Sequence, residues 1–432
     1  MRYLWKNKIL IVILLLLVIM FPSTISIPQQ SRTENIVTAV GIDKSGDEYE
    51  VSIQYVIPYA GDGVKTFKMS SAKGKSVAEA IETLNVETGR LSGFAHCRAL
   101  VFNKEASQEN LTKLLDYFIR IKTNTNNIVL LCAKESSKDT LSAVKNFNGE
   151  FYTILNANGF SNDQRRYQDF KSIGDYYNSF FSPSKSIAIS VIDLKEDDSN
   201  SGGGSGGSSS SGNDKSSGGG SSGSSSSGND KSSGGGSSGG SSGGSSGGGE
   251  KKVSNAGEQV VIKDSKFVAL LNKEQSTNLA FFNPSIRDMN YRLDHFSDEK
   301  CNDVSIYFDI HDKSSKAHVS FVNGKPHYTL DLTLNMRATE IIGQSVGENL
   351  YFLLNKKFTD TLKQRLTNEI TANLRQAEEH FKQNKYDVVK CYETFYKFKN
   401  KEFKAYLNSL PQDKYFLDNI TFDYKITINQ QL

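Results

Sequence analysis

The chain has 432 residues and a formal net charge of +3 at pH 7. Its length allows two or three domains, and so small a net charge gives no indication of nucleic-acid binding. The four cysteines, Cys97, Cys132, Cys301 and Cys391, form no Cys-X-X-Cys pair, which argues against a disulfide framework or a zinc site and favours buried free thiols.

Residues 1–31 are predicted to be a signal peptide or an N-terminal membrane anchor. Three basic residues precede an apolar run from Ile9 to Phe21, and a proline follows it. This pattern is typical of a secretory signal, and the run is short for a membrane-spanning helix. The sequence leaves open cleavage near Ile27 or retention as an anchor, and in both cases the following residues are exported.

Residues 32–195 are predicted to form a mixed α/β N-terminal region, because strand and helix patterns alternate along them. The predicted strands are Ile36–Ile42, Val51–Tyr55, Arg98–Phe102 and Asn127–Ala133, and the predicted helices are Ser76–Leu84, Leu111–Ile121, Ser137–Phe147 and Asp169–Phe181. The alternation indicates a mixed sheet with helices packed on it.

Residues 196–256 are predicted to be a disordered linker made almost entirely of glycine and serine. Ser208–Gly223 recurs without a change as Ser224–Gly239. The repeats contain no apolar residue, so nothing in them offsets the conformational entropy lost on ordering.

We predict that deleting Ser224–Gly239 leaves the melting temperature almost unchanged. The entropy of loop closure changes only slowly with loop length, and no predicted strand or helix loses a residue. Calorimetry on the deletion variant and the parent chain measures this. A large fall in melting temperature would show that the linker is part of the folded structure.

Residues 257–432 are predicted to form an α+β domain, in which a long helix covers an antiparallel sheet. Four stretches alternate apolar and polar residues, as strands with one buried face do, and Asn323-Gly324 is a strong turn pattern. The predicted strands are Val304–Ile310, Ala317–Phe321, Tyr328–Met336 and Ile420–Ile428, preceded by the strand Phe267–Leu271 and the helix Lys273–Phe282.

The long helix is predicted to run from Ser345 to Gln383. Ser345 and Glu348 have the spacing of a capping box. Apolar residues then recur at every fourth position from Leu350 to Leu374, which predicts one helical face that packs on the sheet.

The segment from Val388 to Leu407 interleaves aromatic residues with lysines. Such a pattern can bind nucleic acid or a membrane surface. We favour an amphipathic helix whose rings pack inward while its lysines stay in water.

No residue is predicted to be catalytic, to bind a cofactor or to bind a metal. Gly74-Lys75-Ser76 resembles the end of a phosphate-binding loop, but Met69 occupies the required glycine position. His311, His318 and His327 lack a recognisable set of further ligands. His96 and Cys97 are adjacent at the start of a strand and should point to opposite faces, which argues against a nucleophile and base pair.

Several short motifs, in this order, resemble the Ger(x)C family, the C subunits of nutrient germinant receptors of endospore-forming bacteria. They are Glu34-Asn35-Ile36-Val37 with Val40-Gly41-Ile42-Asp43, Gly74-Lys75-Ser76 with Glu79-Ala80-Ile81, Gly93-Phe94-Ala95-His96, Leu115-Asp116-Tyr117-Phe118-Ile119-Arg120, Lys266-Phe267-Val268-Ala269-Leu270-Leu271 and Tyr386-Asp387. The resemblance covers the chain except for the Gly/Ser linker.

The resemblance implies a non-enzymatic subunit on the outer face of the spore inner membrane, without a cofactor. Its implied partners are the membrane and the membrane-embedded A-type and B-type receptor subunits, and nucleic acid is not among them. One departure is that no cysteine precedes Cys97, whereas family members usually carry a lipid on a cysteine just after the apolar run. The alternative hypothesis is a secreted, membrane-associated module that itself binds a small nutrient.

Overall fold

The computed structural model describes residues 34–57, 67–121, 125–143, 151, 169–196, 251–298, 301–343, 358–412 and 414–431. The predicted N-terminal segment and nearly all of the predicted linker lie outside these residues. In the described part of the chain, no helix is both long and apolar enough to cross a membrane.

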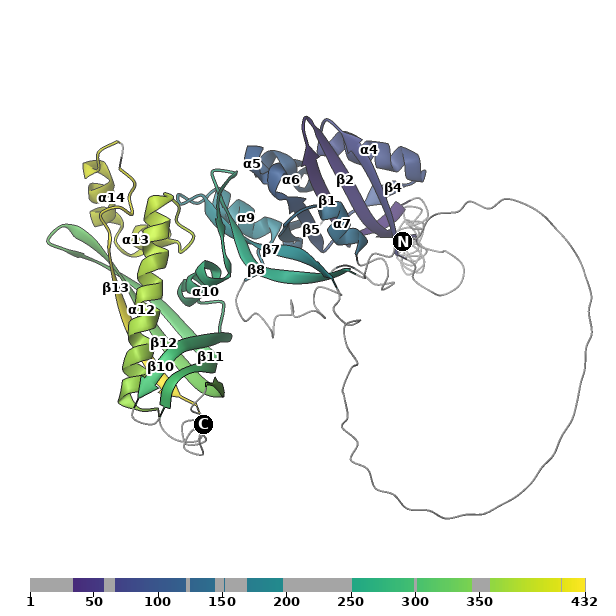
Figure 1. The fold of residues 1–432 in the computed structure, drawn as a ribbon. Helices are drawn as coiled ribbons and strands as arrows, with labels where there is room; N and C mark the ends of the chain where they lie inside the picture. Colours follow the sequence, from purple (N-terminus) through teal and green to yellow (C-terminus); the bar gives the residue numbers. More distant parts are fainter. Residues whose placement is uncertain are drawn as a thin grey trace, which may run out of the picture. The chain divides into compact units, whose positions relative to one another are not determined.

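The first sheet has nine strands within the described residues, in the order β3-β2-β1-β5-β6-β7-β8-β9, with β4 paired to β1 (Figure 1). Neighbouring strands from β1 through β5 and β6 to β7 are parallel, and the hairpins β1–β2, β2–β3 and β8–β9 are antiparallel. The strands are β1 (Glu34–Ser45), β2 (Glu48–Val56), β3 (Phe67–Gly74), β4 (Leu91–Gly93), β5 (Ala99–Asn103), β6 (Val129–Ala133), β7 (Ser186–Glu196), β8 (Lys251–Lys263) and β9 (Lys266–Leu271).

Helices connect β3 to β4, β5 to β6 and β6 to β7, as the alternating pattern predicts. They are α4 (Val77–Thr88), α5 (Lys104–Glu109), α6 (Leu111–Arg120), α7 (Ser137–Ser142) and α9 (Ile173–Phe180), with a short 3-10 helix at Thr125–Asn127. The central strand β5 is buried on both faces: Leu100 and Phe102 enter one apolar core, and Ala99 and Val101 enter the other. This double burial is typical of parallel strands covered by helices.

The strands that follow the linker belong to this first sheet, because β8 and β9 complete its edge beyond β7. The sequence predicts the C-terminal domain from residue 257, and therefore assigns Phe267–Leu271 to it. Strand pairing places β8 and β9, up to Leu271, in the same sheet as the strands that precede the linker. Residues 251–256, which the sequence predicts as the end of the linker, belong to β8, and composition carries no information on which sheet receives that strand.

The second sheet confirms the predicted α+β class, with the order β10-β11-β12-β13. Its strands are β10 (Met289–Asp298), β11 (Cys301–Val322), β12 (Lys325–Ile342) and β13 (Thr421–Gln430). Two predicted strands form the single strand β11, whose register shifts between His311 and Ser314, and β10 was not predicted. Pairs β10–β11 and β11–β12 are antiparallel, whereas β13 is parallel to β12 because helices make the crossover between them.

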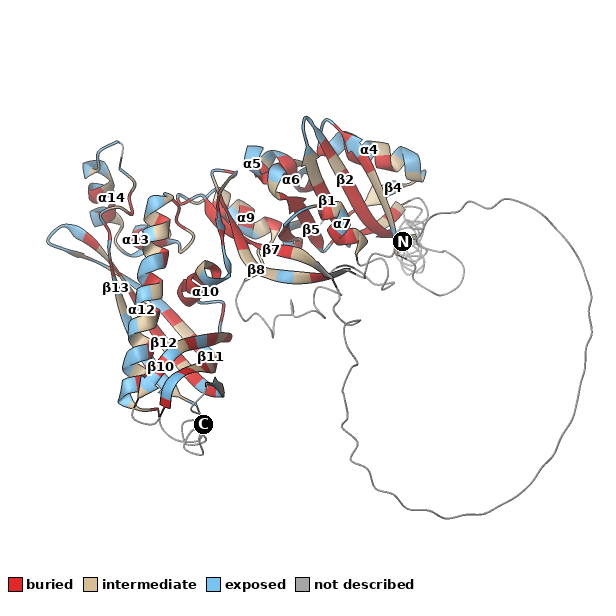
Figure 2. Cartoon of the chain, viewed as in Figure 1, coloured by how far each residue is buried: buried red, intermediate tan, exposed pale blue. Residues whose placement is uncertain are grey.

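The helices of this part are α10 (Lys273–Phe282), α12 (Asp360–Gln383), α13 (Cys391–Phe398) and α14 (Asn400–Ser409). The face of α12 that carries Leu366, Ile370 and Leu374 is fully buried, and Figure 2 shows its opposite face exposed. The prediction that this helix covers the sheet is confirmed, because α12 contacts β10 and β13.

The prediction of one unbroken helix from Ser345 to Gln383 is wrong, because Phe358 and Thr359 are not helical and α12 begins at Asp360. Thr359 has an extended backbone, and its side chain accepts a hydrogen bond from the Leu362 N–H at 3.2 Å. Before it, the Phe358 N–H donates to the Gln430 side chain of β13 rather than to a helical carbonyl. Ser345, Glu348 and Leu350 lie outside the described residues.

The aromatic and lysine segment forms two helices, because the backbone leaves helical geometry at Lys399. Phe395 and Phe403 are fully buried and stack at 5.1 Å, as the prediction of rings that pack inward requires, whereas Tyr396 and Phe398 are exposed and depart from it. All four cysteines are buried free thiols, as predicted.

Candidate functional site

A polar cavity of about 220 Å³ is the candidate site. It is smaller than typical pockets for drug-sized ligands, which hold about 300–1,000 Å³. Its walls come from α9, the start of β7, α10 with the loop after it, and the segment Val388–Lys390. The polar side chains that line it include those of Asp169, Lys171, Ser186, Gln259, Ser276 and Asn283.

Side-chain capping fixes where the two helices beside the cavity, α9 and α10, begin. In α9, the Ser172 side chain accepts from the Asp175 N–H at 3.1 Å, and the Asp175 carboxylate accepts from the Ser172 N–H at 2.9 Å. In α10, Asn272 and Gln275 form the same reciprocal pair, at 2.9 and 3.0 Å. These boxes satisfy N–H groups that a helix start leaves free, and so they fix the register of each helix.

The register of α10 turns Ser276 inward. Its side chain lines the cavity and is only 1% exposed, and the hydroxyl oxygen has no hydrogen-bond partner among the described atoms. An unpaired buried hydroxyl costs about 1–3 kcal/mol. A small polar ligand or a water molecule in the cavity would regain this hydrogen bond.

Charge in the cavity wall is locally balanced. The Lys171 ammonium lies 2.7 Å from the Asp169 carboxylate, and the Asn283 amide donates to the same carboxylate oxygen at 3.4 Å. Both side chains of the ion pair are mostly buried. The cavity therefore offers a solute a cation and an anion side by side, together with neutral donors and acceptors.

Lys313 of β11 holds the loop that closes α10. The side chain is 3% exposed, and its ammonium donates to the Asn283 carbonyl at 2.9 Å and to the Ser315 hydroxyl at 2.6 Å. The Ser315 hydroxyl in turn donates to the Phe281 carbonyl at 2.7 Å, so both groups satisfy carbonyls that a helix end leaves free. Burial lowers the pKa of Lys313 to about 7.

Asp387 lies between α12 and α13, directly before the segment Val388–Lys390 that forms part of the cavity wall. The side chain is fully buried and accepts from the Cys391 N–H at 2.9 Å and the Tyr392 N–H at 2.8 Å. It supplies the cap that Lys390 does not, since Lys390 has φ 56° and no capping hydrogen bond. Burial raises the pKa of Asp387 to about 7, although these two N–H donors favour the charged form.

We predict that Asp387→Ala destabilises the chain by about 2 kcal/mol, the upper range for loss of a helix cap, because two N–H groups of α13 lose their acceptor. Urea unfolding measures the difference. Asp360→Ala, which changes an exposed aspartate in the first turn of α12, is the matched control and should cost much less. Equal effects of the two substitutions would contradict the capping role.

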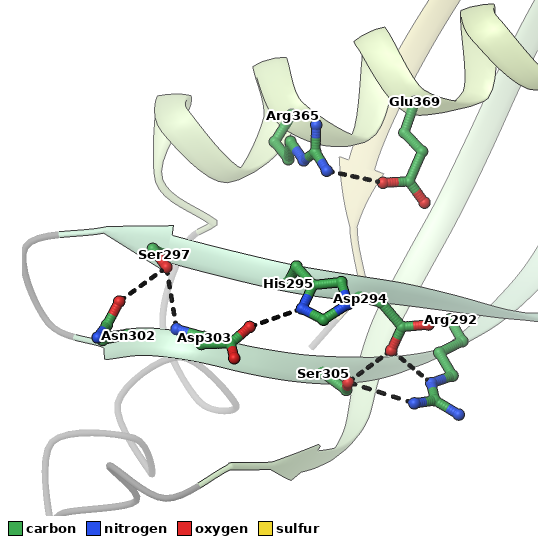
Figure 3. Close-up of polar contacts among 9 residues, drawn as sticks. All are labelled: Arg292, Asp294, His295, Ser297, Asn302, Asp303, Ser305, Arg365 and Glu369. Atoms are coloured by element: carbon green, nitrogen blue, oxygen red, sulfur yellow. Dashed lines mark hydrogen bonds and ion pairs between the residues drawn. The ribbon is translucent and has the colours of Figure 1, made fainter.

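A second polar cluster lies where β10 meets β11 (Figure 3). Asp294 accepts from Arg292 at 2.7 Å and from Ser305 at 2.5 Å, and the hydrogen bond from Ser305 is the main cause of its lowered pKa. His295 and Asp303 pair at 2.7 Å, and both have positive φ, at 53° and 51°. Asp294 and Ser305 are half-buried, the other groups are exposed, and all satisfy one another, so we interpret the cluster as support for an irregular hairpin.

The structure does not bring together the residues examined for chemistry in the sequence. His311 pairs with Asp288 at 3.4 Å, His327 pairs with Asp423 at 3.3 Å, and His318 is exposed on β11. Within the described residues, no group of three or more His, Cys, Asp or Glu could hold a metal.

Gly74 and Ser76 shape the start of α4. The Ser76 hydroxyl caps α4 by accepting from the Glu79 N–H at 3.1 Å. A Cβ at Gly74 would lie 2.6 Å from the Ala80 nitrogen, so the close approach of the backbone requires glycine there. This explains the Gly-Lys-Ser motif without a phosphate.

The sequence missed Ser276, Lys313 and Asp387 as parts of a site. Ser276 looks like an ordinary residue in the first turn of a helix. Lys313 follows Asp312, which has φ 49° at the bulge of β11. In the sequence, the only weak sign of this site is that Asp312 and Lys313 interrupt an otherwise regular alternation of apolar and polar residues. Asp387 precedes the helix it caps by more than the usual spacing, so no standard capping pattern identifies it.

Two family models match this chain in order. The model described as "Spore germination protein N-terminal domain" matches residues 30–194, and the model described as "Spore germination B3/ GerAC like, C-terminal" matches residues 257–430.

The individual relatives share little sequence identity with this chain. The "Putative spore germination protein YfkR" of Bacillus subtilis (strain 168) is 25% identical over 118 residues, which are 24% of this chain and 30% of that protein. The crystal structure of the GerBC protein covers 91% of this chain and 97% of its own, at 14% identity and a TM-score of 0.48. On the two family models, the chain belongs to the GerAC-like family of spore germination proteins.

Proposed function

We propose that this chain is a non-catalytic, extracytoplasmic subunit of a spore nutrient germinant receptor. It would act through contacts with membrane-embedded subunits of the A and B types. The observation that carries the proposal is the match of both spore germination models, in order, to nearly all of the chain outside the linker. The basic end and apolar run of residues 1–31 support export and attachment to the membrane.

The test is co-purification from spore membranes. A C-terminally tagged chain is solubilised in mild detergent and captured, and the captured proteins are identified by mass spectrometry. Two multi-spanning partners should be enriched over a capture with an unrelated tagged spore membrane protein. Recovery of the chain alone, from membranes in which candidate partners are detected, would contradict the proposal.

A second candidate function is the binding of a small polar molecule in the cavity beside α10. It is favoured by the unpartnered Ser276 hydroxyl, which lines a cavity that also presents Asp169 and Lys171. Both functions are compatible with one receptor, because a ligand could be sensed at this subunit and reported through its contacts.

Thermal shift against panels of amino acids and sugars tests this second function. A ligand at one hundred times its dissociation constant stabilises the folded state by about 2.7 kcal/mol. Ser276→Ala should weaken that shift. Ser190→Ala is the matched control, because Ser190 is also a fully buried serine with an unpartnered hydroxyl and does not line the cavity. A shift that survives in the Ser276 variant, or no shift at all, would exclude this hydroxyl as a ligand group.

A further inference from the structure

The helices α13 and α14 present an exposed patch of aromatic and basic residues. We call it the α13–α14 patch and define it by Tyr396, Lys397, Phe398, Lys401 and Lys404. The Phe398 side chain is 60% exposed and that of Tyr396 is 43% exposed. Two large exposed rings on one short helix, with lysines around them, suggest contact with a partner.

Packing holds these rings outward. Phe395 and Phe403 stack at 5.1 Å and are buried, and Phe321 of β11 contacts Phe395 at 5.7 Å. Because α13 is fixed by its inner face, Tyr396 and Phe398 face away from the core, and Figure 2 shows exposed residues along both helices. The rings therefore stay exposed without any rearrangement of the fold.

The charge around the rings is strongly positive. Between residues 396 and 404, four lysines stand against the single acidic residue Glu402, a net charge of +3. In the described structure, none of these lysines forms an ion pair with a carboxylate. Instead, the ammonium groups of Lys397 and Lys404 lie over the rings of Phe398 and Tyr396, at 5.1 and 5.4 Å.

We propose that the α13–α14 patch docks on an anionic lipid surface. Phenylalanine and tyrosine rings can enter the headgroup region, while lysines extend their charged ends to lipid phosphates. An acidic protein partner would also satisfy the lysines. The lipid surface is favoured because the net charge of +3 matches anionic headgroups, and two projecting rings flanked by lysines suit a flat, adaptable surface. The inference goes beyond the proposed receptor role, because it concerns lipid and not another subunit.

A tryptophan reporter in the full chain tests the docking. The chain has one tryptophan, Trp5, so Trp5→Phe combined with Phe398→Trp places a single reporter in the patch. The protein is reconstituted in vesicles of phosphatidylcholine, with or without phosphatidylglycerol, that carry brominated acyl chains as quenchers. Attachment through residues 1–31 is common to both vesicles, so any difference reports on the patch.

We expect a blue shift and quenching on the anionic vesicles, with little of either on the neutral ones. Phe181→Trp in the same Trp5→Phe background is the matched control, because Phe181 is 79% exposed and belongs to the connection after α9, outside the patch. Equal quenching at both reporter positions, or none on anionic vesicles, would overturn the proposal. So would a patch reporter that is protected only when receptor subunits are added, because that result assigns the patch to a protein.

The lysines provide a second arm of the test. Each lysine near an anionic surface strengthens attachment by about fivefold, so replacing Lys397, Lys401 and Lys404 by glutamine should weaken docking by roughly 100-fold and abolish the quenching. The matched control replaces three exposed lysines elsewhere, Lys113, Lys266 and Lys273, and should leave the quenching intact. Unchanged quenching in the patch variant would overturn the electrostatic part of the proposal.

Discussion

Leu366→Asp should unfold the part of the chain built around the second sheet. Leu366 is fully buried on the face of α12 that packs into the apolar core, between Leu362 and Ile370. The substitution removes an apolar contact and places a carboxylate where no partner is available. The cost is several kcal/mol, which is a large share of a typical stability of about 5–15 kcal/mol.

Calorimetry and far-UV circular dichroism measure this effect. Gln364→Asp is the matched control, because it introduces the same residue two positions away on the exposed side of the same helix. The control should change stability by less than about 1 kcal/mol, mainly through helix propensity. A folded Leu366 variant with the stability of the control would show that α12 is not the element that covers the second sheet.

The stability of the chain should rise with pH above neutrality, because Lys313 is buried. Its pKa is about 7 in the folded state, against an ordinary value of 10.5 in the unfolded chain. Between these two values the unfolded chain binds one proton more than the folded chain, so raising the pH favours folding. The expected gain from this lysine is about 1.4 kcal/mol per pH unit, and it is complete above the unfolded pKa.

Urea unfolding of the parent chain and of Lys313→Met, at several values between pH 7 and pH 10, isolates this contribution. Other groups titrate in the same range, but they do so in both proteins. The difference in stability between parent and variant should therefore move in favour of the parent as the pH rises. Lys316→Met, an exposed lysine on the same strand, is the control and should run parallel to the parent. A pH-independent difference for Lys313→Met would show that the ammonium is not desolvated.

Much of the local structure follows from short-range patterns in the sequence. Apolar and polar alternation predicts β12 and β13, because a strand with one buried face must repeat every second residue. Apolar residues at every fourth position from Leu362 to Leu374 predict the buried face of α12 in the same way. Ser76 marks the start of α4 through a hydrogen bond to a residue only three positions away.

The assembly of these elements depends on contacts between distant residues. The sequence predicts the strand Phe267–Leu271, but only the fold shows that it pairs, as β9, with β8 at the edge of the first sheet. It extends the long helix back to Ser345, whereas Thr359 caps the start of α12 and Phe358 before it contacts Gln430 of β13. Local periodicity cannot decide between such alternatives, because each satisfies the same pattern.

The sequence by itself therefore determined the family, the α+β class and the type of most helices and strands, since these rest on composition, periodicity and residues close in the chain. Only the tertiary structure decided the candidate site. Ser276, Lys313 and Asp387 lie on three separate elements, and their roles arise from burial and from partners that the fold supplies. A serine, a lysine and an aspartate look like ordinary surface residues in a sequence. The surrounding chain removes water from them, and that desolvation shifts the pKa values of the lysine and the aspartate and leaves the serine hydroxyl unpaired.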